Sequence, residues 1–286
     1  MLHPNGTTQM LALFGEDLRL SPSPATHTAW AEQAGLNWVY LPMPCQNETA
    51  FMSLCSALME CSGFQGGNIT NPFKRSALNL PGVKLDGSAE LCRAANTLYR
   101  VSENNQSVWR LANTDLAGCS ETLSRILRSV NEQGDLNAAL QFVILGTGAM
   151  ADTCAQAISI ACGHQHNSST TLLSRTQLER GEILKHVPQN RKSHIVVINA
   201  LPSGTRPEAD RLASTALEEL DQLPVYSKHL FEISYLETPA SKHASSSGWG
   251  VTRGEILFEE QARASFKLWA RCSASNSTTA LQPSRE

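Results

Sequence analysis

The chain has 286 residues, of which 41% are hydrophobic and 17% are charged, and its formal net charge at pH 7 is −3. This length and apolar content provide a real core in one large or two medium domains, which excludes a disordered polymer and a coiled coil. A nearly balanced charge gives no overall attraction to nucleic acid or to an anionic membrane, so we expect neither as a partner. Any bound anion must therefore be held by a local site.

The eight cysteines include no C-x-x-C pair, and the N-terminus lacks a basic segment followed by an apolar one. Zinc sites need short ligand spacings, so we predict no bound metal, and the pair His164 and His166 does not change this prediction. No stretch approaches the ~18 consecutive apolar residues of a membrane span. The sequence therefore predicts a cytoplasmic protein with reduced, buried cysteines.

The first part of the chain alternates strand-like and helix-like segments. In order, the patterns predict a strand at 10–15, a helix opening at Ser23-Pro24 with Ser23 as its N-cap, a strand at 36–43, a helix at 48–60 and a strand at 66–70. Residues 97–99 and 107–111 flank the polar segment 103–106 and predict a hairpin. Strands separated by helices favour α/β architecture with a largely parallel sheet.

The second part repeats the alternation more regularly. The predicted elements are a helix from about 118 to 134, a strand at 142–145, a helix ending near Gly163, a strand at 170–173, a helix from about 177, a strand at 194–198, a helix at 208–220 and a strand at about 230–234. This order is typical of a doubly wound nucleotide-binding domain. A last helix is expected over about 254–269.

A glycine loop carries the strongest physical signal. Gly146, Gly148 and Ala151 form G-x-G-x-x-A directly after the apolar strand Phe142–Leu145 and directly before a helix. In such loops the glycines permit a tight turn and let backbone N–H groups approach a pyrophosphate at the helix N-terminus. The alternative is that a buried strand-to-helix turn simply favours glycine. The context favours a dinucleotide.

The end of the following strand bears on which dinucleotide binds. NAD-specific domains tend to carry Asp or Glu there, whereas this chain has Ser174-Arg175-Thr176. An arginine can pair with a 2′-phosphate, which a carboxylate would repel. The sequence therefore favours NADP(H), the alternative being a solvated surface arginine.

Polar clusters also follow strand-like segments in the first part of the chain. They are Ser21-Pro22-Ser23-Pro24, Asn68 to Lys74, Asn96-Thr97 and Asn113-Thr114-Asp115. Taken singly, each cluster is more typical of a turn than of a site. Their position at strand ends is nevertheless where open α/β sheets bind ligands.

Together and in this order, these segments resemble the shikimate dehydrogenase family over nearly the whole chain. The resemblance rests on LALFGEDLRLSPSPATH, NITNPFK, ANT, NTD, FVILGTGAMA, SRT and EEQARASFKLW. Leu20 departs from the family pattern where a histidine usually precedes the first serine. Ile256 departs from it at the second glycine of a G-x-G-M-L-x-x-Q run, where bulk would narrow a nicotinamide pocket.

The resemblance implies reversible hydride transfer between NADPH and 3-dehydroshikimate, giving shikimate. It implies Lys74 and Asp115 as the catalytic pair, and as substrate-binding residues Ser21, Ser23, Thr70, Asn96, Tyr235 and Gln261. The implied cofactor-binding residues are Gly146, Thr147, Gly148, Ala149, Met150, Ala151, Ser174, Arg175, Thr176, Asn199 and Ala200. A quinate or other cyclic polyol dehydrogenase and a ligand-sensing paralogue without turnover stay open as alternatives.

We therefore expect an α/β enzyme with two domains and an active site in the cleft between them. Residues 1–117 are expected to form the substrate domain, and residues 118–250 a Rossmann-type NADP-binding domain. The C-terminal helix within about 251–286 is expected to pack back on the substrate domain. The expected partners are small molecules, and the chain is expected to be a monomer or a homodimer.

Overall fold

The structure is a computed structural model that describes residues 4–104, 106–133, 138–163, 167–188 and 192–279. His164 and His166 lie outside the described residues. The chain divides into two compact units. Unit 1 comprises residues 1–114 and 261–286, and unit 2 comprises residues 115–260.

Unit 1 is built on a six-stranded mixed sheet with the strand order β2-β1-β3-β5-β6-β4. Its elements are β1 (Gln9–Gly15), α1 (Ser23–Gln33), β2 (Trp38–Pro44), α2 (Glu48–Met59), β3 (Phe64–Ile69), the 3₁₀ turn η1 (Ser76–Asn79), β4 (Val83–Leu85), α3 (Gly87–Cys92), β5 (Thr97–Glu103) and β6 (Gln106–Ala112). Strand β1 pairs in parallel with β2 and β3, whereas β5 is antiparallel to both β3 and β6.

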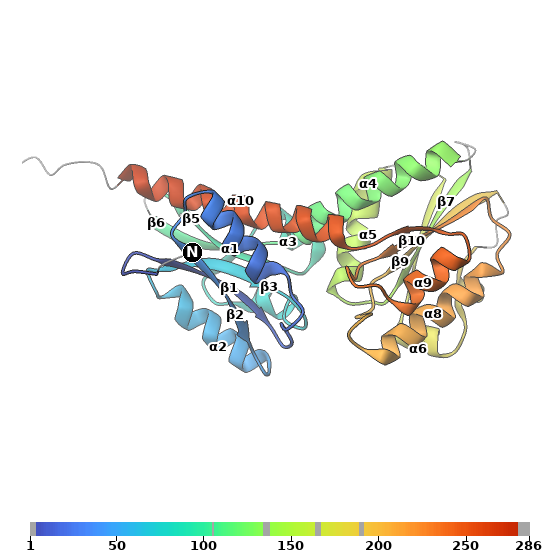
Figure 1. Cartoon of the computed structure of the whole chain (residues 1–286), viewed down its shortest axis with the longest axis horizontal. Coiled ribbons are helices and arrows are strands. Elements are labelled where there is room, and N and C mark those ends of the chain that lie inside the picture. Colours follow the sequence, from blue (N-terminus) through green and yellow to red (C-terminus); the bar gives the residue numbers. More distant parts are fainter. Residues whose placement is uncertain (1–3, 105, 134–137, 164–166, 189–191, 280–286) are drawn as a thin grey trace, which may run out of the picture. The chain divides into compact units, whose positions relative to one another are not determined.

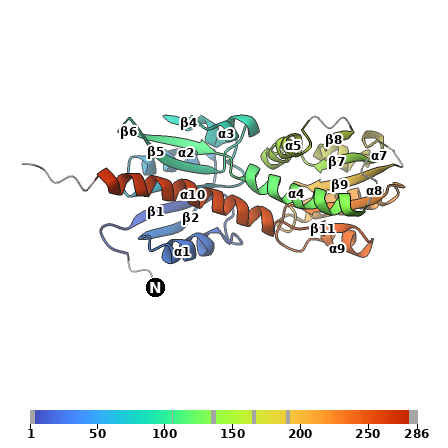
Figure 2. The ribbon, with the colours of Figure 1, turned by 90° about the horizontal axis from the view of Figure 1, so that it is seen from above.

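Helices cover both faces of this sheet (Figures 1 and 2). On one face, Phe51 of α2 packs edge-on against Phe14 of β1 and stacks on Phe73. On the other face lie α1 and the part of α10 (Glu255–Thr279) that belongs to unit 1. There Trp269 is fully buried, and its indole N–H donates to the Leu98 carbonyl at 3.0 Å. The C-terminal helix is thus anchored to the sheet of unit 1.

Unit 2 is a five-stranded sheet with the order β11-β10-β9-β7-β8, and all of its strand pairs are parallel. Its elements are α4 (Asp115–Gln133), β7 (Ala139–Leu145), α5 (Ala149–Cys162), β8 (Ser168–Leu173), α6 (Arg175–Glu179), α7 (Ile183–His186), β9 (Ser193–Asn199), α8 (Pro207–Asp221), β10 (Ser227–Glu232), α9 (Pro239–Ser246), β11 (Gly250–Thr252) and the first residues of α10.

The strands of unit 2 are buried on both faces, because alternate side chains point to opposite sides. Phe142 and Ile144 of β7 pack with α4 and α5, while Val143 and Leu145 pack with the helices from α6 to α9 (Figure 1). This arrangement explains the continuous apolar run of the strand in the sequence.

The predicted α/β class and the Rossmann-type unit are confirmed, and so is the antiparallel hairpin, formed by β5 and β6. Ser23 is not an N-cap: helix α1 begins at Ser23 itself, and Pro22 precedes it without a capping side chain. The helix expected from about 177 is the five-residue α6, which begins at Arg175. Unit 1 has a mixed sheet, because β5 reverses direction after α3.

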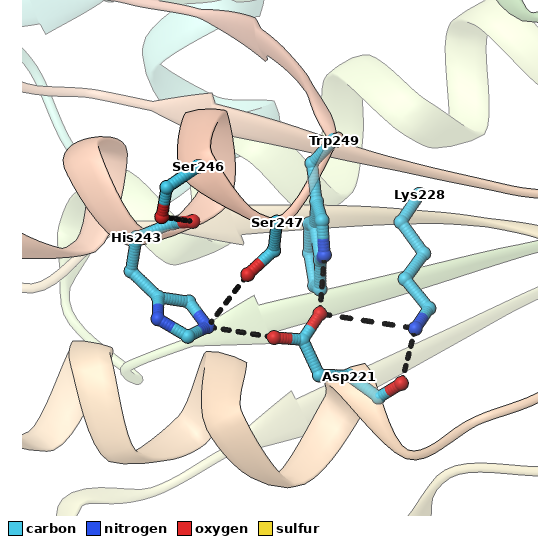
Figure 3. A network of polar contacts seen from close by, with 6 residues as sticks. All are labelled: Asp221, Lys228, His243, Ser246, Ser247 and Trp249. Carbon is cyan, nitrogen blue, oxygen red and sulfur yellow. Dashed lines mark hydrogen bonds and ion pairs between the residues drawn. The ribbon is translucent and has the colours of Figure 1, made fainter.

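A network of polar contacts joins α8, β10, α9 and the segment before β11 around Asp221 (Figure 3). Trp249 Nε1 donates to Asp221 Oδ1 at 2.6 Å, His243 Nε2 lies 2.7 Å from Oδ2, and Lys228 Nζ lies 3.8 Å from Oδ1. Burial alone would raise the pKa of Asp221, but hydrogen bonds from Trp249, His243 and Ser247 outweigh it and lower that pKa below its usual value.

The cluster of Asp221, His243 and Ser247 is structural rather than nucleophilic. In a catalytic triad the two ring nitrogens of histidine serve different partners. Here His243 Nε2 faces both Asp221 Oδ2, at 2.7 Å, and Ser247 Oγ, at 3.5 Å. The ring therefore cannot pass a proton from the serine while the carboxylate holds its other nitrogen.

We predict that Asp221→Asn lowers the free energy of unfolding by about 1–2 kcal/mol, because it weakens charge-assisted hydrogen bonds to a half-buried carboxylate. Urea unfolding at pH 7 measures the change. Glu218→Gln, on an exposed position of the same helix, is the matched control and should leave the unfolding midpoint unchanged. Equal effects of the two substitutions would contradict a stabilising role for the network.

Candidate functional site

In unit 1, Ser21 and Ser23 follow the carboxyl end of β1, Thr70 and Lys74 follow that of β3, and Asn96 directly precedes β5. The Thr70 N–H donates to the Phe14 carbonyl at 2.8 Å, which joins the two segments that leave these strands. The Ala95 N–H donates to the Lys74 carbonyl at 2.8 Å, and the Ile69 N–H donates to the Asn96 carbonyl at 2.8 Å. Backbone hydrogen bonds therefore bring the segments of Thr70, Lys74 and Asn96 together.

The Asn96 side chain has a defined orientation. Its Oδ1 accepts hydrogen bonds from the Thr114 N–H at 2.7 Å and from the hydroxyls of Thr114 at 3.0 Å and Thr97 at 3.1 Å. A backbone N–H can only donate, so the atom that faces it must be the amide oxygen. Asn96 Nδ2 then faces Gln261 Oε1 at 3.4 Å. The contact joins two predicted substrate-binding residues that lie far apart in the sequence.

The two serines expected to bind substrate lie together at the start of α1. The Ser23 N–H donates to Ser21 Oγ at 3.3 Å, and Ser23 is buried while Ser21 is half-buried. Leu20, which precedes them, is 60% exposed. A large apolar side chain thus stands in solvent beside the predicted carboxylate-binding serines.

The remaining predicted catalytic and substrate residues are divided between the units. Lys74 is half-buried in unit 1, whereas Asp115 is the first residue of α4, in unit 2, and is 5% exposed. Tyr235 is also in unit 2, where its ring lies edge-on to that of Phe258, with 6.1 Å between the ring centroids. Burial raises the pKa of the Tyr235 hydroxyl. The Ile233 carbonyl passes so close to Gly254 that an added Cβ would lie 2.0 Å from it, which explains a glycine beside the Tyr235 segment.

In unit 2 the predicted cofactor residues lie at one edge of the sheet. Leu145 of β7 pairs in register with both Leu173 of β8 and Asn199 of β9, so the segments that follow these three strands leave the sheet together. Since β8 and β9 lie on opposite sides of β7, this edge is the topological switch point, where open α/β sheets bind ligands.

The glycine loop at this edge fits a bound dinucleotide. Gly146 has φ +112°, which a side chain would strain. Gly148 caps α5 without a side-chain bond, and no heavy atom lies within 4 Å of where its Cβ would stand. The N–H groups of Ala149, Met150 and Ala151 follow this glycine in the first turn of α5, where a helix makes no bonds to them itself.

In the segment after β8, Ser174 has a structural role, whereas Arg175 and Thr176 are accessible to a ligand. Ser174 caps α6: its hydroxyl donates to Gln177 Oε1 at 2.8 Å and accepts from the Gln177 N–H at 3.4 Å. Arg175 and Thr176 are exposed, and Arg175 Nη1 lies 3.6 Å from Glu208 Oε2. Arg175 thus provides a solvent-accessible positive charge at this edge.

Asn199, at the end of β9, contacts a buried carboxylate at the end of β10, Glu232, which is not among the residues predicted from the sequence. Asn199 Nδ2 donates to Glu232 Oε2 and to Ser203 Oγ, both at 2.9 Å, and the Thr238 hydroxyl donates to Glu232 Oε2 at 2.8 Å. Asn199 and Glu232 are both fully buried. The Asn199 amide therefore has a structural role. Of the two residues predicted here to bind the cofactor, Ala200 is the more accessible. A glutamate within the apolar run HLFEIS was the available signal.

Burial raises the pKa of Glu232 to about 7, against the hydrogen bonds from Asn199 and Thr238, which lower it. A carboxyl whose pKa is higher in the folded than in the unfolded chain binds its proton more tightly when folded. Its contribution to stability is therefore present at low pH and is lost as the pH rises from about 4.5 to about 7.

We predict that the free energy of unfolding of the wild-type protein, relative to Glu232→Gln, falls by up to about 3 kcal/mol between pH 5 and pH 8. The amide substitution removes the titration, while every other group cancels in the difference. Urea unfolding of both proteins at four pH values measures it. Parallel stability curves would show that the carboxyl does not titrate in this range.

Unit 2 also contains a hollow of about 650 Å³, whose lining includes Glu237, Ser241, Arg253, Glu255 and Ile256. Ile256, the departure from the family pattern, is the only lining residue singled out from the sequence. Across the described residues, no group of three or more His, Cys, Asp or Glu side chains is placed to hold a metal ion. In the same part of the chain no helix is both long and apolar enough to cross a bilayer.

Comparisons with known proteins agree with this architecture. Residues 13–98 match the sequence model of the shikimate dehydrogenase substrate binding domain. The protein named shikimate dehydrogenase (NADP(+)) of Methanosarcina barkeri is 26% identical over 280 residues, which cover 91% of this chain and 92% of that protein. Its namesake in Methanosarcina mazei is 28% identical over 272 residues, covering 91% and 92% of the two chains.

Among solved structures, a shikimate dehydrogenase in complex with NADP⁺ is similar in fold. It has a TM-score of 0.65 at 22% identity, and the match covers 93% of this chain and 91% of that one. The parallel sheet with a glycine loop at its switch point defines unit 2 as a Rossmann-type dinucleotide-binding fold. Unit 1 contains the segment that matches the shikimate dehydrogenase substrate binding domain, and the whole chain is similar to proteins named shikimate dehydrogenase (NADP(+)).

Proposed function

We propose that this chain catalyses the reversible, NADP(H)-dependent reduction of 3-dehydroshikimate to shikimate. The observation that carries the proposal is the hydrogen-bonded gathering of Thr70, Lys74, Asn96 and Gln261 in unit 1. Relatives that match nine tenths of the chain are named for this activity and this cofactor. The residues that gather are those that the family resemblance selects for binding and turnover.

In the proposed mechanism the chain's own residues manage charge and protons at the ketone. When bound, NADPH supplies the hydride that adds to the carbonyl carbon. The carbonyl oxygen then gains negative charge, and the Lys74 ammonium stabilises that charge and donates a proton to it. Asp115 orients the ammonium and accepts a hydrogen bond from a neighbouring hydroxyl. In the reverse direction, the Lys74 amine accepts the hydroxyl proton.

Binding of the substrate is proposed to use neutral donors. The hydroxyls of Ser21 and Ser23 hold the carboxylate, while Thr70, Asn96, Tyr235 and Gln261 bind the ring hydroxyls. Hydroxyl and amide donors hold a single anion without a basic patch, which agrees with the net charge of −3.

For the cofactor, we propose that the α5 N-terminus and the loop 146–151 hold the pyrophosphate. The segment Ser174-Arg175-Thr176 lies beside the predicted 2′-phosphate, with Arg175 providing the charge. The Ser174 side chain is already engaged with Gln177, so its contribution is to fix the segment that carries Arg175. Ala200 lines the site beside them, and the buried Asn199 supports the strand end that carries it.

Lys74→Ala is predicted to lower kcat by about 10²–10⁴-fold, as the loss of a general acid does, with a smaller change in the KM for shikimate. Steady-state NADP⁺ reduction, followed by absorbance with shikimate and separately with quinate, measures it. Lys84→Ala is the matched control, since Lys84 is exposed and pairs with Glu103. A kcat near the wild-type value for Lys74→Ala would remove Lys74 from the mechanism. Faster turnover of quinate than of shikimate by the wild-type protein would replace the proposed substrate.

Arg175→Ala is predicted to raise the KM for NADPH by about 10–100-fold while changing the KM for NADH by less than about twofold. Only NADPH carries the 2′-phosphate that the guanidinium would contact. Arg180→Ala, an exposed arginine at the end of α6, serves as the control. An equal change for both cofactors would exclude the phosphate role.

A further inference from the structure

Three buried hydroxyls meet in unit 1 beside the proposed substrate site. Thr97 Oγ1 lies 3.0 Å from Thr114 Oγ1, and Ser265 Oγ lies 2.9 Å from each of them. Thr97 follows Asn96 at the start of β5, Thr114 follows β6, and Ser265 is on α10. We call these three residues the hydroxyl cluster. It joins the sheet of unit 1 to the helix that carries Gln261.

The bonds of this cluster account for each hydroxyl proton once. Ser265 Oγ donates to the Gln261 carbonyl at 3.0 Å and accepts from Asn68 Nδ2 at 2.9 Å. The hydroxyls of Thr97 and Thr114 donate to Asn96 Oδ1, at 3.1 and 3.0 Å. Ser265 Oγ, which lies 2.9 Å from both threonine oxygens, packs against the two hydroxyls that donate to Asn96 Oδ1.

Burial makes this arrangement sensitive to the loss of one member. Thr97 and Ser265 are fully buried and Thr114 is 6% exposed, so water cannot readily replace a missing partner. Without the Ser265 oxygen, the Thr97 and Thr114 hydroxyls each lose a neighbour and Asn68 Nδ2 loses an acceptor. The two threonine side chains then lose the oxygen that packs against both of them and are held less firmly against Asn96 Oδ1, which weakens the hold on the Asn96 amide.

We propose that Ser265 is a positioning residue for substrate binding. The Thr114 N–H sets the orientation of the Asn96 amide, and Ser265, acting through the hydroxyl cluster, helps to hold that amide in place with its nitrogen facing Gln261 and the ligand. The Asn96 amide is then a donor to the substrate, and the group it recognises is an oxygen acceptor. This inference rests on the proposed function, because it assigns Asn96 to the shikimate site.

The test compares Ser265→Ala with Ser124→Ala. Ser124, on α4, makes the same kind of bond to the carbonyl four residues earlier, at 2.8 Å, but belongs to no such cluster. We expect Ser265→Ala to raise the KM and the Kd for shikimate by about 5–30-fold, the equivalent of one or two lost hydrogen bonds. We expect kcat and the KM for NADP⁺ to stay within about twofold, and Ser124→Ala to match the wild-type protein.

A double-mutant cycle separates positioning from packing. If Ser265 acts through Asn96, then Ser265→Ala should add less than about twofold to the shikimate Kd of Asn96→Ala. Independent, multiplying losses would overturn the proposal, as would an unchanged shikimate KM in Ser265→Ala. If Ser265→Ala does not fold, Thr97→Val removes another hydroxyl of the cluster at nearly constant volume and must raise the shikimate KM in the same range.

Different experimental results would contradict the proposed function and the positioning role of Ser265. A folded wild-type protein that does not reduce NADP⁺ with shikimate contradicts the proposed function itself. An active wild-type protein whose shikimate KM is unaffected by Ser265→Ala contradicts only the positioning role.

Discussion

The register of parallel strands is the constraint on which both candidate sites depend. Hydrogen bonds between adjacent parallel strands hold their carboxyl ends at one edge of a sheet, so the segments that follow them must lie side by side. In unit 2, Leu145, Leu173 and Asn199 end three neighbouring strands at one level. In unit 1, the hydrogen bond from the Thr70 N–H to the Phe14 carbonyl likewise holds the ends of β1 and β3 side by side. Residues far apart in the sequence thereby become neighbours.

In each unit, hydrogen bonds to the side-chain amide also fix the orientation of an asparagine beside the candidate site. Asn96 Oδ1 accepts hydrogen bonds from Thr97 and Thr114, whereas the Asn199 Nδ2 amino group donates hydrogen bonds to Glu232 and Ser203. Buried polar groups without partners are costly, so such networks have a defined geometry. The two side-chain amides therefore have different roles. Asn96 presents its nitrogen toward Gln261, while Asn199 is enclosed and supports the strand ends around it.

Sequence patterns predicted the elements with strong periodicity and missed the short ones. The strand around Phe142 and the glycine loop were predictable, because continuous apolar residues followed by glycines leave few alternatives. Strands β4 and β11 have three residues each, too few for a period to show. Ser174 was assigned to the cofactor from its motif, but its capping bond with Gln177 depends on where α6 begins. Ser265 was missed because its partners come from distant segments, and for Glu232 the interrupted apolar run indicates a buried carboxylate but not its partners.

The proposed function depends on the Lys74 ammonium and the Asp115 carboxylate acting together on one substrate. The most direct measurement is a crystal structure of the wild-type protein with NADP⁺ and shikimate bound together. The proposal predicts Lys74 Nζ and the Asp115 carboxylate within hydrogen-bond distance of neighbouring ring hydroxyls, with the nicotinamide C4 facing the carbon to be oxidised. Shikimate bound with Lys74 Nζ out of reach of every ring hydroxyl would contradict it.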